Sequence, residues 1–119
     1  IELLLEIPEY QEAEKVGAGP EILVGSPSGS VGEKFVFFTG GTSPGPKAIP
    51  KLSRAGVSTI VTMHMGEDIK KVCEEEGLYV VIAGHDSSDS IGMNLILDEL
   101  EKTGIKTYAC SGLTRHRRF

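Results

Sequence analysis

The chain has 119 residues, of which 12 are lysine or arginine and 17 are aspartate or glutamate, so its formal net charge is −5. This length is that of one domain with a substantial hydrophobic core, and the acidic balance argues against a nucleic-acid-binding surface, which needs basic residues to neutralise phosphates. No apolar run approaches the ~18 residues of a membrane-spanning helix, and no signal-peptide pattern is present. We therefore expect neither a nucleic-acid nor a membrane partner.

The two cysteines indicate a reducing environment. Cys73 and Cys110 form no CxxC motif and no disulfide framework, and this usage is typical of cytoplasmic proteins. Cys73 shares helical spacing with Ile69 and Val72, which predicts a place for it in the core.

The first third of the chain is predicted to hold a helix and two strands. Residues 1–16 have an acidic helical pattern that is interrupted at Pro8. Residues 21–25 and 34–38 are strand candidates, and the Gly/Ser/Pro loop between them suits an antiparallel hairpin.

Strands and helices alternate in the rest of the chain. We predict helices at about 47–55, 67–76 and 88–103 and strands over 57–63, 78–83 and 105–109. This order predicts an α/β domain of three layers with a mostly parallel sheet, to which the N-terminal β-hairpin is added.

Two patterns near the C-terminus carry further predictions. The helix over 88–103 has an apolar stripe at the spacing of one buried face, formed by Met93, Ile96, Leu97 and Leu100. The basic run over 115–118 is expected to be a solvated, mobile terminus rather than a binding arm.

Candidate site residues follow three of the predicted strands. Open α/β sheets bind ligands at the carboxyl ends of their strands. Three loops leave that edge, at 39–42, 64–66 and 84–89, and two of the three histidines lie in them. We therefore expect His64, His85 and the glycine-rich turn over 39–42 to share one edge of the sheet.

His85 and Asp89 are candidate metal ligands. They lie four residues apart where the central strand passes into a helix, and imidazole and carboxylate groups suit zinc, manganese or iron. The alternative is structural: Asp86 and Asp89 also resemble a capping box, and His85 could hydrogen-bond a loop carbonyl.

For two further candidates, a functional and a structural interpretation are about equally supported. His64 is a possible third ligand, acid or base, or else a strand-end histidine bonded to the backbone. Thr39, Gly40, Gly41 and Thr42 offer N–H groups and hydroxyls to a phosphate or carboxylate, without forming a P-loop, or else make a structural turn.

At these residues the chain resembles a known family. The segment Val81-Ile82-Ala83-Gly84-His85-x-x-Ser88-Asp89-x-x-Gly92 is similar to the GHxxTE-type motif of the NGG-interacting factor three family, also described as GTP cyclohydrolase type 2 homologues. The residues at 39–42, 63–65 and 110–112 resemble accompanying signatures of one bacterial branch. The likeness covers most of residues 7–115.

The resemblance implies properties that the residues alone do not. Members of the family form toroidal oligomers, often hexamers, around a site for two metal ions. His85 and Asp89 match its C-terminal pair of ligands, with Asp89 in place of the usual Glu. The other ligands, a His-His pair and an Asp, belong to an N-terminal half of the family. We therefore expect residues 1–119 to be one α/β domain from the C-terminal part of a longer homo-oligomeric protein.

Three functions are consistent with this sequence. The first is a metal-dependent hydrolase of a nucleotide or related small molecule, in which His85 and Asp89 hold metal and His64 moves a proton. The second is a non-catalytic metal-binding or protein-interaction module. The third is a phosphate-binding domain that uses the turn over 39–42 without metal.

Overall fold

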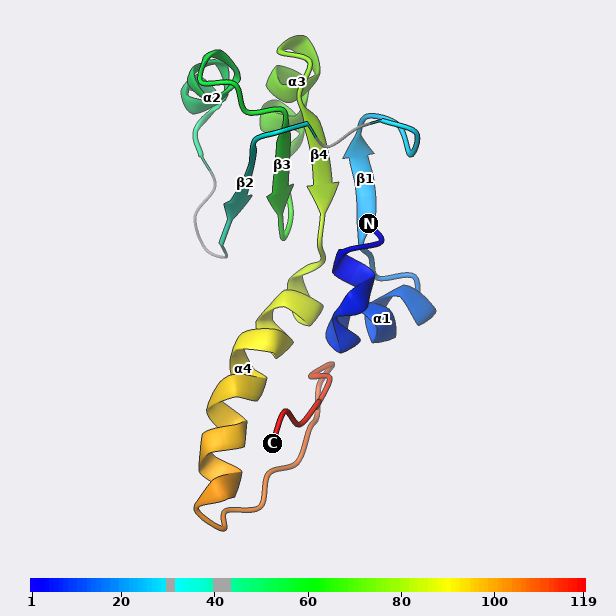
Figure 1. Cartoon of the computed structure of the whole chain (residues 1–119), viewed down its shortest axis with the longest axis vertical. Coiled ribbons are helices and arrows are strands. Elements are labelled where there is room, and N and C mark those ends of the chain that lie inside the picture. The colour runs from blue at the N-terminus through cyan, green and yellow to red at the C-terminus, as the bar shows by residue number, and fades with distance from the viewer. Residues whose placement is uncertain (30–31, 40–43) are drawn as a thin grey trace.

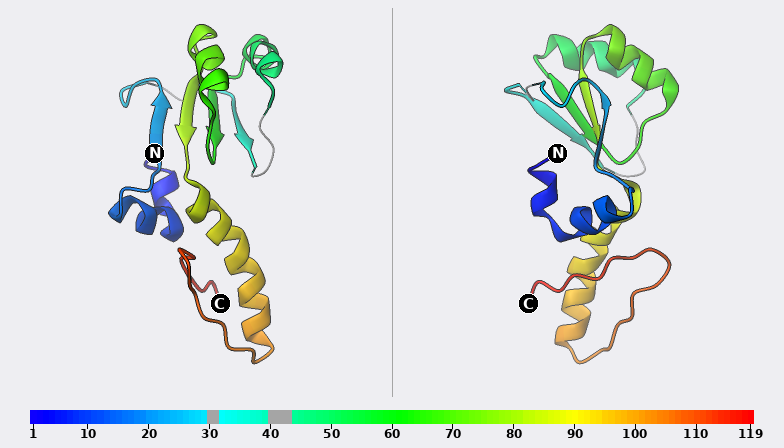
Figure 2. Two further views of the ribbon diagram at one scale, coloured as in Figure 1. Left: turned by 180° about the vertical axis from the view of Figure 1, so that it is seen from behind. Right: turned by 90° about the vertical axis from the view of Figure 1, so that its right-hand side faces the viewer.

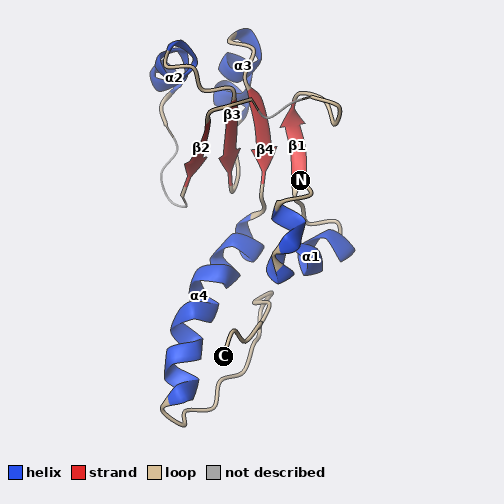
Figure 3. Cartoon of the chain, in the orientation of Figure 1, coloured by secondary structure: helices blue, strands red, loops and turns tan. Residues whose placement is uncertain are grey.

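The structure, a computed structural model, describes residues 1–29, 32–39 and 44–119. Its elements are shown in Figures 1 and 3, and their bounds follow in chain order. They are η1 (Leu4–Glu6), α1 (Pro8–Lys15), β1 (Glu21–Val24), β2 (Phe35–Phe38), η2 (Pro46–Ala48), α2 (Ile49–Arg54), β3 (Thr59–Thr62), α3 (Glu67–Glu75), β4 (Tyr79–Ile82) and α4 (His85–Lys102). No helix in the described part of the chain is both long and apolar enough to cross a membrane.

The four strands form one mixed sheet in the order β1-β4-β3-β2. β2, β3 and β4 are parallel, whereas β1 is antiparallel to β4. This arrangement confirms the prediction of an α/β fold with a mostly parallel sheet. The predicted pairing of 21–25 with 34–38 in a hairpin is wrong, because β1 and β2 occupy opposite edges. β3 and β4 are the central strands of the sheet, and each holds a fully buried residue, Ile60 in β3 and Val80 in β4.

Helices α2 and α3 lie along one face of the sheet, whereas η1 and α1 lie beyond the end of the strands, beside the start of α4 (Figure 2). On one face α2 and α3 enclose the main core, whose most buried members are Ile49, Ile60, Cys73 and Val80. On the other face η1 and α1 bring Leu4, Ile7 and Tyr10 against Val61 and Ala83. The prediction that Cys73 belongs to the core is confirmed, and both cysteines are free.

Helix α4 extends away from the sheet (Figure 1), and its polar side faces the rest of the chain. Its buried residues are Ser87, Ser90, Asn94 and Asp98. Met93, Ile96 and Leu100 of the predicted core stripe are instead 44%, 57% and 39% exposed. The prediction that this stripe is buried is therefore wrong for these three residues, whereas Leu97 is partly buried. The cause is that α1 and the C-terminal segment, residues 105–119, bind to the polar side of the helix.

The C-terminal segment runs back along α4 without forming the predicted strand over 105–109. Three backbone N–H groups of the segment donate to three side chains of the helix. The pairs are Thr114 to Ser90 Oγ at 3.1 Å, His116 to Asn94 Oδ1 at 3.3 Å and Arg118 to Asp98 Oδ2 at 3.1 Å. The spacings match because four helical residues rise about 6 Å and two extended residues span about 6.6 Å.

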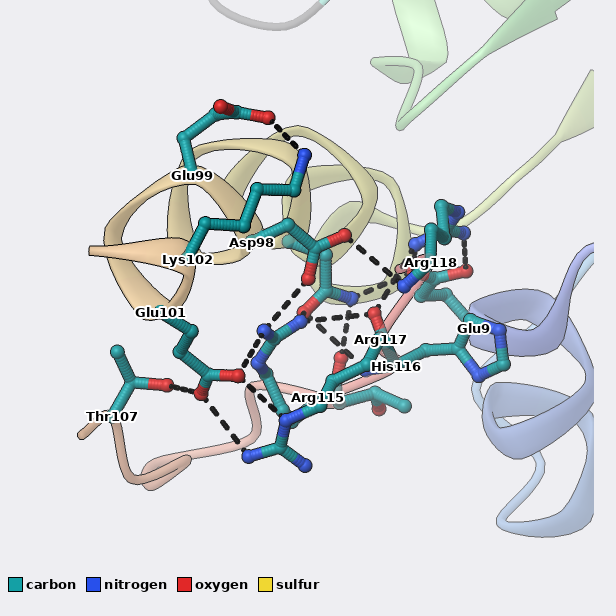
Figure 4. Close-up of polar contacts among 12 residues, drawn as sticks. Glu9, Asp98, Glu99, Glu101, Lys102, Thr107, Arg115, His116, Arg117 and Arg118 are labelled. Carbon is teal, nitrogen blue, oxygen red and sulfur yellow. Dashed lines mark hydrogen bonds and ion pairs between the residues drawn. The ribbon is translucent and has the colours of Figure 1, made fainter. Parts of the chain in front are cut away.

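Ion pairs fix this segment to α4 and α1 (Figure 4). Arg118 donates two hydrogen bonds to the fully buried Glu9, at 2.7 and 2.6 Å, and Asn94 donates a third at 2.6 Å. Arg115 contacts Asp98 at 2.7 Å and Glu101 at 3.0 Å, and Arg117 contacts Glu101 at 2.6 Å. We call this group the terminal clasp: Glu9, Asn94, Asp98, Glu101, Arg115, Arg117 and Arg118. The prediction of a solvated, mobile terminus is wrong.

The clasp shifts the pKa values of its carboxylates. Burial on its own would raise the pKa of Glu9 and of Asp98, but hydrogen bonds from Arg118 and Asn94 to Glu9, and from Arg115 and Arg118 to Asp98, outweigh burial and lower both. Hydrogen bonds from Arg117 and Thr107 lower the pKa of Glu101 to about 2. The ionised forms of all three groups are therefore favoured by folding.

Replacing Glu9 by Gln should destabilise the chain, because the side chain keeps its shape but leaves Arg118 without its counter-charge. We expect a loss of about 3 kcal/mol in the free energy of unfolding, measured by urea denaturation. Glu12→Gln is the matched control, because Glu12 is on the same helix and its side chain is 51% exposed. Its effect should stay within about 0.5 kcal/mol. Equal losses in the two variants would contradict the role given to the clasp.

Acid should weaken the clasp in a defined range of pH. The folded-state pKa of Glu101 is about 2, below its ordinary 4.5, so the unfolded chain binds more protons between these values. The stability that Glu101 contributes is therefore present above pH 4.5 and is lost as the pH falls towards 2. In urea titrations across this range, Glu101→Gln should lose less stability than the wild type, and Glu99→Gln, altered at an exposed carboxylate, should behave as the wild type. A wild-type profile as flat as that of Glu101→Gln would contradict this account.

Candidate metal site

A glycine turn connects the centre of the sheet to the candidate site. Gly84 separates β4 from α4 and has a φ of 103°, which is in the region that favours glycine. A Cβ atom at this position would lie 2.9 Å from the carbonyl oxygen of Ala18 and 2.8 Å from Ser87 Oγ. Only a residue without a side chain fits here, so the turn can be tight enough for α4 to begin directly at His85.

This early start of α4 excludes one part of the structural interpretation, the capping box. The helix begins at His85 rather than near 88, and its N-cap residue, Gly84, makes no side-chain capping bond. The capping box proposed for Asp86 and Asp89 is therefore not formed. Instead His85 and Asp89 lie one turn apart on the same face of the helix.

His85, Asp89 and His64 come together at the carboxyl edge of the sheet. His85 Nε2 lies 3.3 Å from Asp89 Oδ2, and the two side chains are 52% and 60% exposed. The ring of His64, which follows β3, is stacked on that of His85 with 5.5 Å between centroids and an angle of 5° between planes. The predicted pair of His85 and Asp89 and the histidine predicted at the same edge of the sheet, His64, thus form one cluster.

Two hollows flank the cluster. One, of about 230 Å³, is lined by Asp89, Thr39 and Tyr10 among others. The other, of about 470 Å³, is lined by His85 and Asp86 together with residues of α1. Thr39 thus reaches the neighbourhood of Asp89, whereas Gly40, Gly41 and Thr42 lie outside the described residues.

Tyr10 also supports this site, although no sequence pattern indicates it. Its hydroxyl is hydrogen-bonded to Ser88 Oγ at 3.0 Å, and Ser88 Oγ donates to the carbonyl of Gly84 at 2.6 Å. These bonds connect α1 to the first turn of α4, which carries His85. Tyr10 lies far from that turn in the sequence. The spacing of apolar residues on α1 indicates only that the ring of Tyr10 is buried.

The cluster provides a pair of possible metal ligands and no more within the described chain. Among residues 1–29, 32–39 and 44–119, no three His, Cys, Asp or Glu side chains are grouped closely enough to hold an ion. A site built on His85 and Asp89 would need further ligands.

Comparison with known proteins identifies similar folds. A NIF3 superfamily protein from Sphaerobacter thermophilus matches 95% of this chain with 25% identity and a TM-score of 0.78. A structural-genomics protein of unknown function, ybgI, matches 76% with 23% identity and a TM-score of 0.50, and is similar in fold. The chain spans 40% and 35% of these two proteins. No family model matches the chain, and no curated protein does. The chain is thus similar, over nearly its whole length, to part of a NIF3 superfamily protein.

Removing the Tyr10 hydroxyl should loosen the contact between α1 and α4. Tyr10→Phe keeps the packed ring and breaks the hydrogen bond to Ser88, so we expect a loss of about 1 kcal/mol in urea denaturation. Tyr108→Phe is the matched control, because Tyr108 is 83% exposed. A loss no greater than that of the control would show that the hydrogen bond does not support this turn.

Proposed function

We propose that this chain is part of a NIF3 superfamily protein in which His85 and Asp89 bind a divalent metal ion, and that the complete protein hydrolyses a nucleotide or related small molecule. The observation that carries the proposal is the distance of 3.3 Å between His85 Nε2 and Asp89 Oδ2. Two ligand atoms each about 2.0–2.1 Å from a tetrahedral ion lie about 3.3–3.4 Å apart. The pair thus has the separation that two zinc ligands require.

The chemistry of the pair also suits such an ion. A neutral imidazole and a carboxylate are ligands for zinc, manganese and iron. Both side chains are about half exposed, so an ion could reach them from solvent. The helix presents them together because residues four apart share a face.

The remaining ligands must come from outside the pair. The family resemblance implies a His-His pair and an Asp from another part of the complete protein, a second ion and a hexameric assembly. The usage of the two cysteines favours a cytoplasmic location. We include these properties in the proposal because the chain is similar in structure to a NIF3 superfamily protein, of which it spans 40%.

A bound ion of this class would supply activated water at neutral pH. His64 would then hold or move a proton, because its ring is stacked on that of His85 and therefore lies beside the proposed ion. Thr39 lines the hollow beside Asp89 and would contact the substrate there. An anion site over 39–42 stays a prediction.

One observation favours a non-catalytic metal-binding module instead. The hollow beside Asp89 has a volume of about 230 Å³, below the roughly 300–1,000 Å³ that is usual for small-molecule sites, whereas the hollow beside His85, of about 470 Å³, reaches that range. In this alternative the metal would serve assembly rather than turnover.

Zinc titration of the chain tests the proposal. His85→Ala and Asp89→Asn should each weaken zinc binding at least about tenfold, measured by calorimetry. His116→Ala is the control, because His116 lies on the C-terminal segment outside the cluster and its loss should change the affinity less than about twofold. Unchanged affinity in His85→Ala would remove the proposed ligand.

Turnover separates the two functions. A panel of nucleotides assayed with the complete protein and metal should show hydrolysis that His85→Ala abolishes while its circular dichroism stays that of the wild type. Zinc binding without hydrolysis of any nucleotide would favour the non-catalytic module.

A further inference from the structure

The hollow beside His85 has walls from three distant parts of the chain. It lies between the end of α1, the first turn of α4 and the C-terminal segment. Two hydrogen bonds fix the C-terminal wall: the N–H of Thr114 donates to Ser90 Oγ at 3.1 Å, and its carbonyl accepts from Asn94 Nδ2 at 2.8 Å. Because its walls are held in place, the hollow has a defined shape before any ligand binds.

Asp86 brings a carboxylate without a partner to this hollow. Its side chain is exposed, and within the described chain it forms neither an ion pair nor a hydrogen bond. A Cβ atom at Gly112, whose φ is 88°, would lie 3.5 Å from Asp86 Oδ2, so the glycine leaves open the space in front of the carboxylate. Glu12 also lines the hollow but is paired with Lys15. Among the described residues of the lining there is no lysine or arginine.

We propose that this hollow binds the base of the nucleotide substrate and that Asp86 selects bases that carry an exocyclic amino group. The inference rests on the proposed function, in which the metal ion lies at His85 and Asp89. A carboxylate accepts hydrogen bonds from N–H groups and repels phosphate, so the phosphates lie away from Asp86 and the amino group lies towards it. Aspartate and glutamate recognise the amino group of cytosine in the same way in protein–DNA complexes.

The wall contributed by α1 suits the flat face of a base. Ala13 and Val16 line it, and Val16 is 78% exposed in the described chain. Contact with a base would remove this apolar surface from water. The hollow thus offers an apolar surface and a charged acceptor together. A base with an amino group can use both, whereas a simple amine uses only the acceptor and a phosphate uses neither.

The test compares nucleotides that differ by one amino group: GMP with IMP, and AMP with purine riboside 5′-monophosphate. Binding to the chain is followed by NMR titration up to about 10 mM, which detects weak affinities, and a chelator removes any metal. In at least one pair, the nucleotide with the amino group should bind at least about tenfold more tightly, because a hydrogen bond to a charged group contributes about this factor. Asp86→Ala should reduce the difference to less than about twofold.

Two further variants distinguish the acceptor from the rest of the hollow. Asp68→Ala is the matched control, because Asp68 is an exposed aspartate in the first turn of α3, and it should leave the preference unchanged. Val16→Ser should weaken both members of a pair equally, because it removes apolar contact and leaves the acceptor in place.

Equal affinities within both pairs, a preference that Asp86→Ala retains or that Asp68→Ala also removes, or no binding of any of the four nucleotides would each overturn the inference. The zinc titration described above separates it from the proposed function. A chain that binds zinc but shows no preference for the amino group would overturn only this inference, and a preference without zinc binding would overturn only the proposed function.

Discussion

The turn at Gly84 is the constraint on which the candidate site depends. Thr62 of β3 and Ile82 of β4 are partners in register, and Ala83 continues the ladder by donating to the carbonyl of Thr62 at 2.8 Å. The two strands therefore end at the same level, and the residues that follow them, His64 and His85, emerge side by side. Because Gly84 has no side chain, α4 begins at once and brings Asp89 to the same place. The parallel register and one glycine together assemble the cluster.

The terminal clasp explains why α4 has the orientation that it has. Ser90, Asn94 and Asp98 accept hydrogen bonds from the N–H groups of alternate residues of the C-terminal segment. The segment therefore pairs with a row of helix side chains in the way that it would pair with the backbone of a neighbouring strand. Glu9 and Arg118 close the arrangement by linking α1 to the end of the chain. A buried ion pair of this kind is weak support for stability as such, but losing one partner leaves an unpaired charge. The clasp thus fixes which side of α4 is covered and leaves the apolar side outward.

Much of the fold could be predicted because its signals are local. The β-branched run of β3, the apolar run of β4 and the Ile69, Val72 and Cys73 spacing of α3 each predict an element and its buried side. The convergence of His64 and His85 followed from one general rule about parallel sheets. The family resemblance drawn from residues around His85 agrees with the structural match to a NIF3 superfamily protein.

The errors arose where long-range partners decide the structure. Periodicity shows that Met93, Ile96 and Leu100 share a face, but it cannot show what covers that face. The arginines at 115, 117 and 118 resemble a solvated tail unless their partners are known. These partners are Asp98 and Glu101 for Arg115 and Arg117, and Glu9, more than 100 residues away in sequence, for Arg118. Nor can a strand pattern say whether β1 pairs with its neighbour in sequence or with β4. In each case the residues close in sequence do not reveal which other part of the chain they contact.

The most direct test of the central claim is to observe the histidine rings during zinc addition. The chain has three histidines, so a long-range ¹H–¹⁵N spectrum resolves each ring and its tautomer. The account predicts a saturable shift of His85 Nε2, the nitrogen that faces Asp89, with a smaller change at the stacked ring of His64 and none at His116. A His85 ring that does not respond while zinc binds elsewhere would contradict it.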